Sequence, residues 1–110
     1  MNRTSKVILI TGASTGFGNL TAKLLAKAGH TVYATMRNTT GKNKAHKDAL
    51  LDWGKLHQAK LRVVELDVTQ DKSVEDAKEL ILSETNGSID VIINNAGIYG
   101  GGIQEAFTVT

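Results

Sequence analysis

A run of small residues directly follows the first apolar segment of the chain. That segment covers residues 7–10, and the sequence then reads TGASTGFG, with glycine at positions 12, 16 and 18. Glycine lets main-chain N–H groups approach a ligand closely, and a helix that starts at such a turn offers free N–H groups and positive potential to an anion. Ser14 and Thr15 can add hydroxyl donors. We interpret the turn as a phosphate-binding site, although a tight turn without a ligand would have a similar composition.

The glycine spacing distinguishes this turn from two common phosphate-binding motifs. It reads G-x-x-x-G-x-G, whereas one dinucleotide-binding motif is G-x-G-x-x-G and the P-loop is G-x-x-x-x-G-K-S/T. Phe17 stands where a P-loop requires glycine, and Gly18 stands where its lysine would be. The spacing therefore excludes a P-loop.

Four short apolar segments rich in β-branched residues indicate strands at residues 7–10, 31–35, 61–66 and 89–93. Each is nearly continuous rather than alternating, which is typical of strands buried on both faces. Helical apolar stripes lie between them. We expect buried stripes at Phe17, Leu20, Leu24, Leu25 and Ala28; at Ala45, Ala49, Trp53 and Leu56; and at Val74, Ala77 and Ile81. The order β-α-β-α-β-α-β predicts a doubly wound α/β fold of Rossmann type with a parallel sheet, or the N-terminal part of one.

The length and composition of the chain limit the classes of protein to which it can belong. With 110 residues and a net charge of +2, the chain fits a single small domain, residues 1–110. The absence of cysteine excludes disulfides and thiolate metal sites. No apolar run approaches the roughly 18 residues of a membrane span, and no signal peptide is evident, so we expect a cytoplasmic protein without a membrane partner. The basic stretch at 42–62 is interpreted as a solvated helix surface rather than a nucleic-acid site, because aromatic residues are scarce.

Three separated motifs occur together: TGASTGFG at 11–18, LDVT at 66–69 and NNAG at 94–97. Their order and spacing resemble the short-chain dehydrogenase/reductase family from about Lys6 onward. The resemblance implies that the pyrophosphate of a dinucleotide is held by Gly12, Gly16 and Gly18, with Ser14, Thr15 and the main chain of Phe17 beside it. It places Asp67 and Val68 beside the adenine ring, and Asn95, Ala96 and Gly97 under the ribose and nicotinamide. Asn94 would tie neighbouring strands.

The end of the second strand bears on the choice between NAD and NADP. An NAD site places a carboxylate there to accept hydrogen bonds from the ribose hydroxyls, and that carboxylate repels a 2′-phosphate. In this sequence the position holds Met36 and Arg37 instead. A guanidinium suits a phosphate through charge-assisted hydrogen bonds. We therefore favour NADP over NAD, while an exposed arginine that only caps the sheet edge is the alternative.

The family's catalytic residues are expected outside this sequence. The resemblance implies hydride transfer between nicotinamide and a small-molecule carbonyl or alcohol, assisted by a tyrosine, a lysine four residues later and an upstream serine. Tyr33 is followed at that spacing by Arg37, and Tyr99 by Ile103, so we assign no catalytic residue within 1–110. We expect the cofactor-binding part of a longer NADP-dependent oxidoreductase, with homo-oligomerisation left open. The alternative is a non-catalytic nucleotide-binding half-domain or a truncated remnant.

Overall fold

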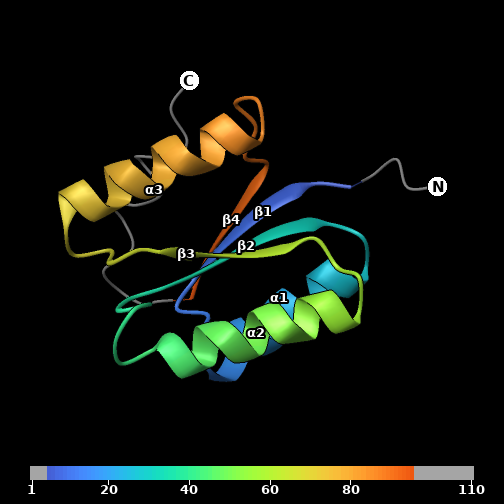
Figure 1. Ribbon diagram of the computed structural model, residues 1–110. Coiled ribbons are helices and arrows are strands. Elements are labelled where there is room, and N and C mark those ends of the chain that lie inside the picture. The colour runs from blue at the N-terminus through green and yellow to red at the C-terminus, as the bar shows by residue number, and fades with distance from the viewer. Residues whose placement is uncertain (1–4, 96–110) are drawn as a thin grey trace.

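The chain folds into a parallel sheet with helices on both faces. The computed structural model describes residues 5–95. Its elements are β1 (Val7–Thr11), α1 (Gly16–Lys27), β2 (Thr31–Met36), α2 (Lys44–Leu56), β3 (Leu61–Glu65), α3 (Asp71–Glu84) and β4 (Val91–Asn94) (Figure 1). The predicted element order is confirmed.

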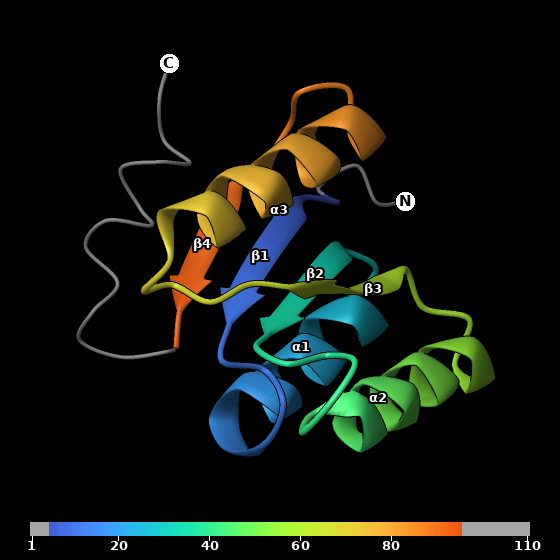
Figure 2. The ribbon, with the colours of Figure 1, turned by 60° about the vertical axis from the view of Figure 1, so that its left-hand side comes forward.

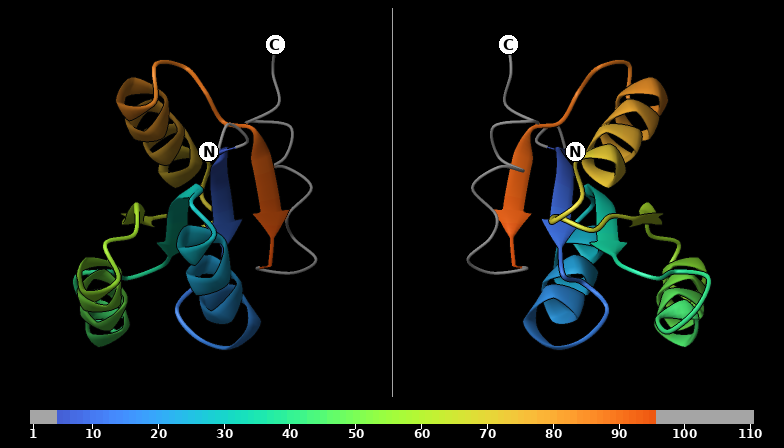
Figure 3. Two further views of the ribbon diagram at one scale, coloured as in Figure 1. Left: turned by 90° about the vertical axis from the view of Figure 1, so that its right-hand side faces the viewer. Right: turned by 90° about the vertical axis from the view of Figure 1, so that its left-hand side faces the viewer.

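The four strands have the order β3-β2-β1-β4 and all neighbours are parallel. Figure 2 shows the arrowheads of β1, β2 and β4 pointing to the same end of the sheet. Helices α1 and α2 cover one face and α3 covers the other (Figure 3). The doubly wound parallel sheet predicted from the sequence is thus confirmed.

The central strands β1 and β2 are buried on both faces, as their continuous apolar segments predict, whereas the edge strand β3 exposes Arg62 and Glu65 and the edge strand β4 is half-buried. Along β1, Ile8 and Ile10 join the core beneath α1 and α2, whereas Leu9 joins the core beneath α3. Alternate side chains of a strand point to opposite faces, so a strand between two helical layers must be apolar at every position. Because all neighbouring strands are parallel, their carboxyl ends lie together at one edge of the sheet.

The buried faces of α1 and α2 match those expected only at Leu25 and Trp53, which are half-buried and pack against the core. In α1 the buried residues are Gly18, Ala22 and Ala26, and the large side chains at positions 17, 20 and 24 are 75%, 53% and 60% exposed. In α2 the buried residues are Leu50 and Gly54, while Leu56 is 79% exposed. Small residues let a helix approach the sheet closely. A prediction of the buried face from large apolar residues leaves such small residues out.

Helix α3 buries the face that the sequence predicts. Val74, Ala77 and Ile81 are all buried against the sheet. The last strand begins slightly later than expected, at Val91, because Asp90 instead bonds the start of β1: its main-chain N–H donates to the Val7 carbonyl at 2.9 Å, and its Oδ2 accepts from the Val7 N–H at 2.8 Å. None of the helices within residues 5–95 is long and apolar enough to cross a membrane.

A tyrosine links the sheet to α3 near the amino ends of the strands. Tyr33 is buried, and its hydroxyl donates to Glu84 Oε1 at 2.8 Å. Burial, followed by this hydrogen bond, raises the pKa of Tyr33 to about 12. Arg62 Nε lies 3.7 Å from the same Glu84 oxygen. These groups line a second pocket of about 490 Å³. Within it, the Glu84 carboxylate accepts the hydrogen bond from Tyr33 and forms the ion pair with Arg62.

Candidate functional site

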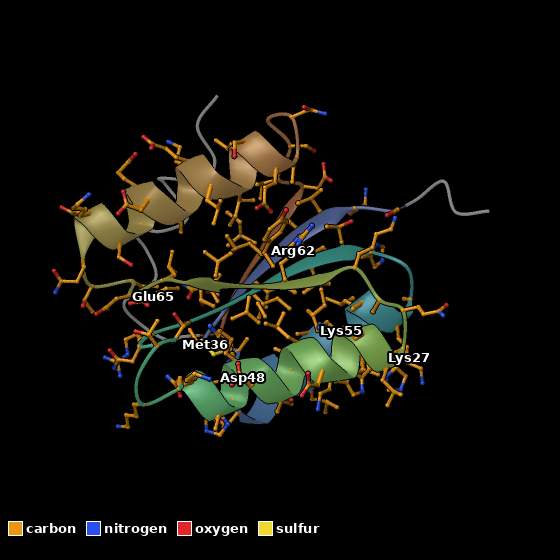
Figure 4. All side chains as sticks on the ribbon, viewed as in Figure 1. Lys27, Met36, Asp48, Lys55, Arg62 and Glu65 are labelled. Atoms are coloured by element: carbon orange, nitrogen blue, oxygen red, sulfur yellow. The ribbon has the colours of Figure 1, made fainter. Side chains whose placement is uncertain are left out.

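A pocket of about 380 Å³ opens where β1, β2 and β3 end. Three chain segments form its walls: the turn after β1, the loop after β2, and residues 66–69 after β3. Figure 4 shows Met36 and Glu65, the last residues of β2 and β3, at the same end of the sheet. In parallel sheets with helices on both faces, ligands bind outside the carboxyl ends of the strands. The pocket occupies that place.

The glycine turn forms the first wall through Gly12 and Ser14. Gly12 and Gly16 have φ values of 64° and 63°, a left-handed conformation that other residues adopt only with strain. The Ala13 N–H donates to the Thr35 carbonyl at 2.9 Å and ties the turn to β2. The turn is therefore held in one conformation by its neighbouring strand.

Helix α1 begins within the same turn. Thr15 is the N-cap residue, and its side chain makes no capping hydrogen bond within the part of the chain that the structure describes. The first N–H groups of a helix have no acceptor in the helix itself, and they attract anions such as phosphate. The start of α1 at Gly16 thus leaves these donors for a ligand.

Gly18 lies where α1 passes closest to the end of β1. A Cβ atom at this position would overlap the Gly12 carbonyl oxygen and lie 2.7 Å from Asn95 Nδ2. The Asn95 amide donates to that same Gly12 carbonyl at 3.0 Å. Asn95 therefore braces the turn from the end of β4, and glycine at position 18 makes this arrangement possible.

Arg37 and the loop that follows β2 form the second wall. Met36 is buried, Arg37 is exposed, and both line the pocket together with Asn43. The Asn43 amide donates to the Arg37 carbonyl at 2.7 Å. A positively charged side chain therefore stands at the rim, on a main chain that is held from within the loop.

Asp67 is the charged group of the third wall. Its Oδ1 accepts from the Thr69 hydroxyl at 2.7 Å and from the Thr69 N–H at 3.0 Å, and its own N–H donates to Ser73 Oγ at 2.8 Å. The Thr69 side-chain and main-chain hydrogen bonds, with a smaller effect of the Arg37 charge, lower the pKa of Asp67 below its ordinary value. The carboxylate therefore stays ionised and can accept a hydrogen bond from a ligand at neutral pH.

The structure brings together most of the residues that the sequence singles out. Gly12, Ser14, Arg37, Asp67 and Val68 line the pocket itself. Thr15, Gly16, Phe17 and Gly18 occupy the adjoining turn and the start of α1, and the Phe17 side chain points into solvent. Thr11 Oγ1 donates to Asn94 Oδ1 at 3.0 Å, so Asn94 ties β1 to β4 as expected. Ala96 and Gly97 lie outside the described residues.

Met36, Leu66 and Thr69 also line the pocket without having been predicted to bind the cofactor, and Asn43 is the lining residue that no motif or strand end indicated. It stands several residues beyond β2, in a loop whose path no periodic pattern predicts. Its position directly before a helix is the one signal available, and asparagine there is ordinarily expected to cap that helix.

Comparison with known proteins identifies relatives of the whole described fold. The sequence profile described as short chain dehydrogenase matches residues 6–110. The chain is 42% identical over 103 residues to a 3-ketodihydrosphingosine reductase of Bacteroides thetaiotaomicron, in an alignment that covers 94% of this chain and 32% of that protein.

Two solved structures of reductases are also similar to this chain. Actinorhodin polyketide ketoreductase with NADPH is similar with a TM-score of 0.73 and 27% identity, over 88% of this chain and 35% of that one. NADPH-bound carbonyl reductase from chicken fatty liver is similar with a TM-score of 0.71 and 30% identity, over 86% and 35%. The chain thus spans about a third of the length of these proteins. Because the profile covers nearly all of its residues, the chain belongs to the short chain dehydrogenase family.

Proposed function

We propose that this chain is the cofactor-binding part of an NADP-dependent short-chain oxidoreductase. The activity would be hydride transfer between the nicotinamide and a carbonyl or alcohol group of a small-molecule substrate. The observation that carries the proposal is the pocket at the strand ends, where a glycine turn, the Arg37 guanidinium and the Asp67 carboxylate meet. Members of the family bind NAD or NADP, and the similar ketoreductase has NADPH bound.

Each wall of the pocket has donors and acceptors that fit one portion of the dinucleotide. The turn at Gly12, Ser14, Thr15, Gly16, Phe17 and Gly18 would hold the pyrophosphate on main-chain N–H groups and hydroxyls. Asp67 would accept from the adenine amino group, with Val68 against the ring. Asn95, Ala96 and Gly97 would lie under the ribose and nicotinamide. The bound cofactor would supply the hydride, and these side chains would orient it.

The preference for NADP over NAD rests on the charges at the pocket rim. Arg37 follows β2 at the place where an NAD site would hold a carboxylate. The nearest acid on the adjoining strand, Glu65, accepts a hydrogen bond from the Thr39 hydroxyl at 2.8 Å. Glu65 is not among the residues that line the pocket, which leaves the positive Arg37 as the charged group of this wall.

The test compares binding of adenosine 2′,5′-bisphosphate and adenosine 5′-monophosphate by isothermal titration calorimetry. These two ligands differ only in the 2′-phosphate. We expect the unmodified protein to prefer the bisphosphate, and Arg37→Ser to weaken that ligand about tenfold while the monophosphate is unaffected. An unchanged preference in Arg37→Ser would overturn the assignment of NADP to this residue.

Arg62→Ser is the matched control, because Arg62 is also exposed but lies on β3 in the second pocket, away from the proposed site. It should change neither affinity. If the unmodified protein binds neither nucleotide, the nucleotide-binding function itself is wrong. Loss of NADPH absorbance in the presence of a panel of ketones would test hydride transfer separately, in the full-length enzyme.

A further inference from the structure

We propose that Asn43 is a positioning residue that sets the preference for a 2′-phosphate by fixing the main chain at Arg37. The inference rests on the proposed function and adds to it a residue outside the motifs that carry the family resemblance. Asn43 lines the same pocket as Arg37, and its amide nitrogen donates to the Arg37 carbonyl at 2.7 Å.

The loop after β2 closes on itself through Asn43. The Asn43 main-chain N–H donates to the Asn38 carbonyl at 2.9 Å, and the Gly41 N–H donates to that same carbonyl at 3.1 Å. Asn38 has a φ of 49°, so the chain reverses direction directly after Arg37. The side-chain bond from Asn43 to Arg37 completes this loop and fixes where it begins.

Asn43 is itself held by α2. Its carbonyl accepts the Lys47 N–H at 2.9 Å, in the first turn of the helix. Asn43 is also the N-cap residue of α2, yet its side chain makes no capping hydrogen bond in the described structure. A capping asparagine ordinarily stabilises its helix by about 1 kcal/mol. Here the Asn43 side chain instead donates to the Arg37 carbonyl. This hydrogen bond connects the start of α2 to the rim of the pocket.

This connection matters because the Arg37 side chain is exposed and long. A free arginine samples many rotamers, and ordering it on a ligand opposes binding. Fixing the carbonyl of the same residue restricts where the guanidinium can be placed. The 2′-phosphate should gain from this restriction, whereas the rest of the nucleotide, which the proposal assigns to other residues, should not.

The test measures both adenosine nucleotides on Asn43→Ala by calorimetry. We expect binding of the 2′,5′-bisphosphate to weaken about five- to tenfold and that of the 5′-monophosphate to stay within about twofold. Asn19→Ala is the matched control, because the Asn19 amide also bonds main-chain carbonyls, those of Ala13 and Ser14 at 3.3 and 3.4 Å, but in the glycine turn. It should weaken both nucleotides by similar factors.

A double substitution tests whether Asn43 acts through Arg37. In the Arg37→Ser background, Asn43→Ala should produce no further loss of bisphosphate affinity, since the group that it positions is gone. Equal weakening of both nucleotides by Asn43→Ala, an unchanged preference, or full additivity with Arg37→Ser would each overturn the role of Asn43. Failure of the unmodified protein to prefer the bisphosphate would instead overturn the proposed function, and this inference with it. Should Asn43→Ala not fold, Asn43→Ser gives the same readouts.

Discussion

Gly18 is the single residue at which steric space most limits the candidate site. An added Cβ would overlap the Gly12 carbonyl and crowd the Asn95 amide that braces it. We therefore expect Gly18→Ala to lower the free energy of unfolding by about 1–3 kcal/mol, because the helix and the strand end must separate. Urea denaturation measures this change. Gly41→Ala is the control, since a Cβ there meets no heavy atom within 4 Å, and equal effects of the two changes would contradict the steric argument.

Residues in the site differ in how well the sequence predicts them. Gly12 and Arg37 directly follow β1 and β2, and Asp67 lies two residues beyond β3, so a correct strand assignment also places them at one edge of the sheet. Asn43 and Thr39 lie in a loop, and their hydrogen bonds to Arg37 and Glu65 depend on a chain reversal that leaves no repeating pattern. Periodicity predicts elements, whereas loop contacts depend on individual dihedral angles.

At the scale of elements, the helices also show what sequence periodicity can and cannot predict. The order of the elements along the chain and the buried face of α3 were predictable, and in α3 this is because the apolar residues are also the buried ones. In α1 the contact with the sheet uses Gly18, Ala22 and Ala26, which are selected by size rather than hydrophobicity, whereas α2 buries Leu50 beside Gly54. A pattern that scores apolar bulk therefore assigns the wrong face to a closely packed helix.

This close packing of α1 can be tested with two substitutions on the same helix. Leu24→Gln should change the free energy of unfolding by less than about 0.5 kcal/mol, because the side chain is exposed. Ala22→Leu should destabilise by about 1–3 kcal/mol, because Ala22 is fully buried against the sheet. Thermal or urea denaturation of both variants decides the matter, and a larger loss for Leu24→Gln would mean that the large side chains form the packed face.

At the scale of the whole molecule, Tyr33 and Glu84 connect the sheet to the helical layer formed by α3, and their hydrogen bond makes stability depend on pH. The pKa of Tyr33 rises from 10.0 to about 12 on folding, chiefly through burial and then through the bond to Glu84. The folded protein therefore keeps this proton more strongly than the unfolded chain. Its contribution to stability is fully present below about pH 10 and is lost as the pH rises towards about 12.

Urea denaturation across this pH range tests the connection. The free energy of unfolding should fall between about pH 10 and 12 in the unmodified protein, and the fall should be smaller in Tyr33→Phe. The difference between the two proteins removes the background from lysines, which titrate in the same range. Parallel curves for the two proteins would show that the Tyr33 hydroxyl does not carry a raised pKa.

The pairing of β1 with β4 has a consequence for the kinetics of folding. Thr11 and Asn94, which lie opposite each other in this pair, are 83 residues apart in the sequence. Contacts of such long range form slowly, because the chain must close a large loop before the strands can meet. Residues 1–110 contain no proline, so prolyl isomerisation within them cannot supply a slow phase. We expect the docking of β4 to be a late step, which brings the Asn95 amide to the Gly12 carbonyl and so braces the glycine turn beside the pocket.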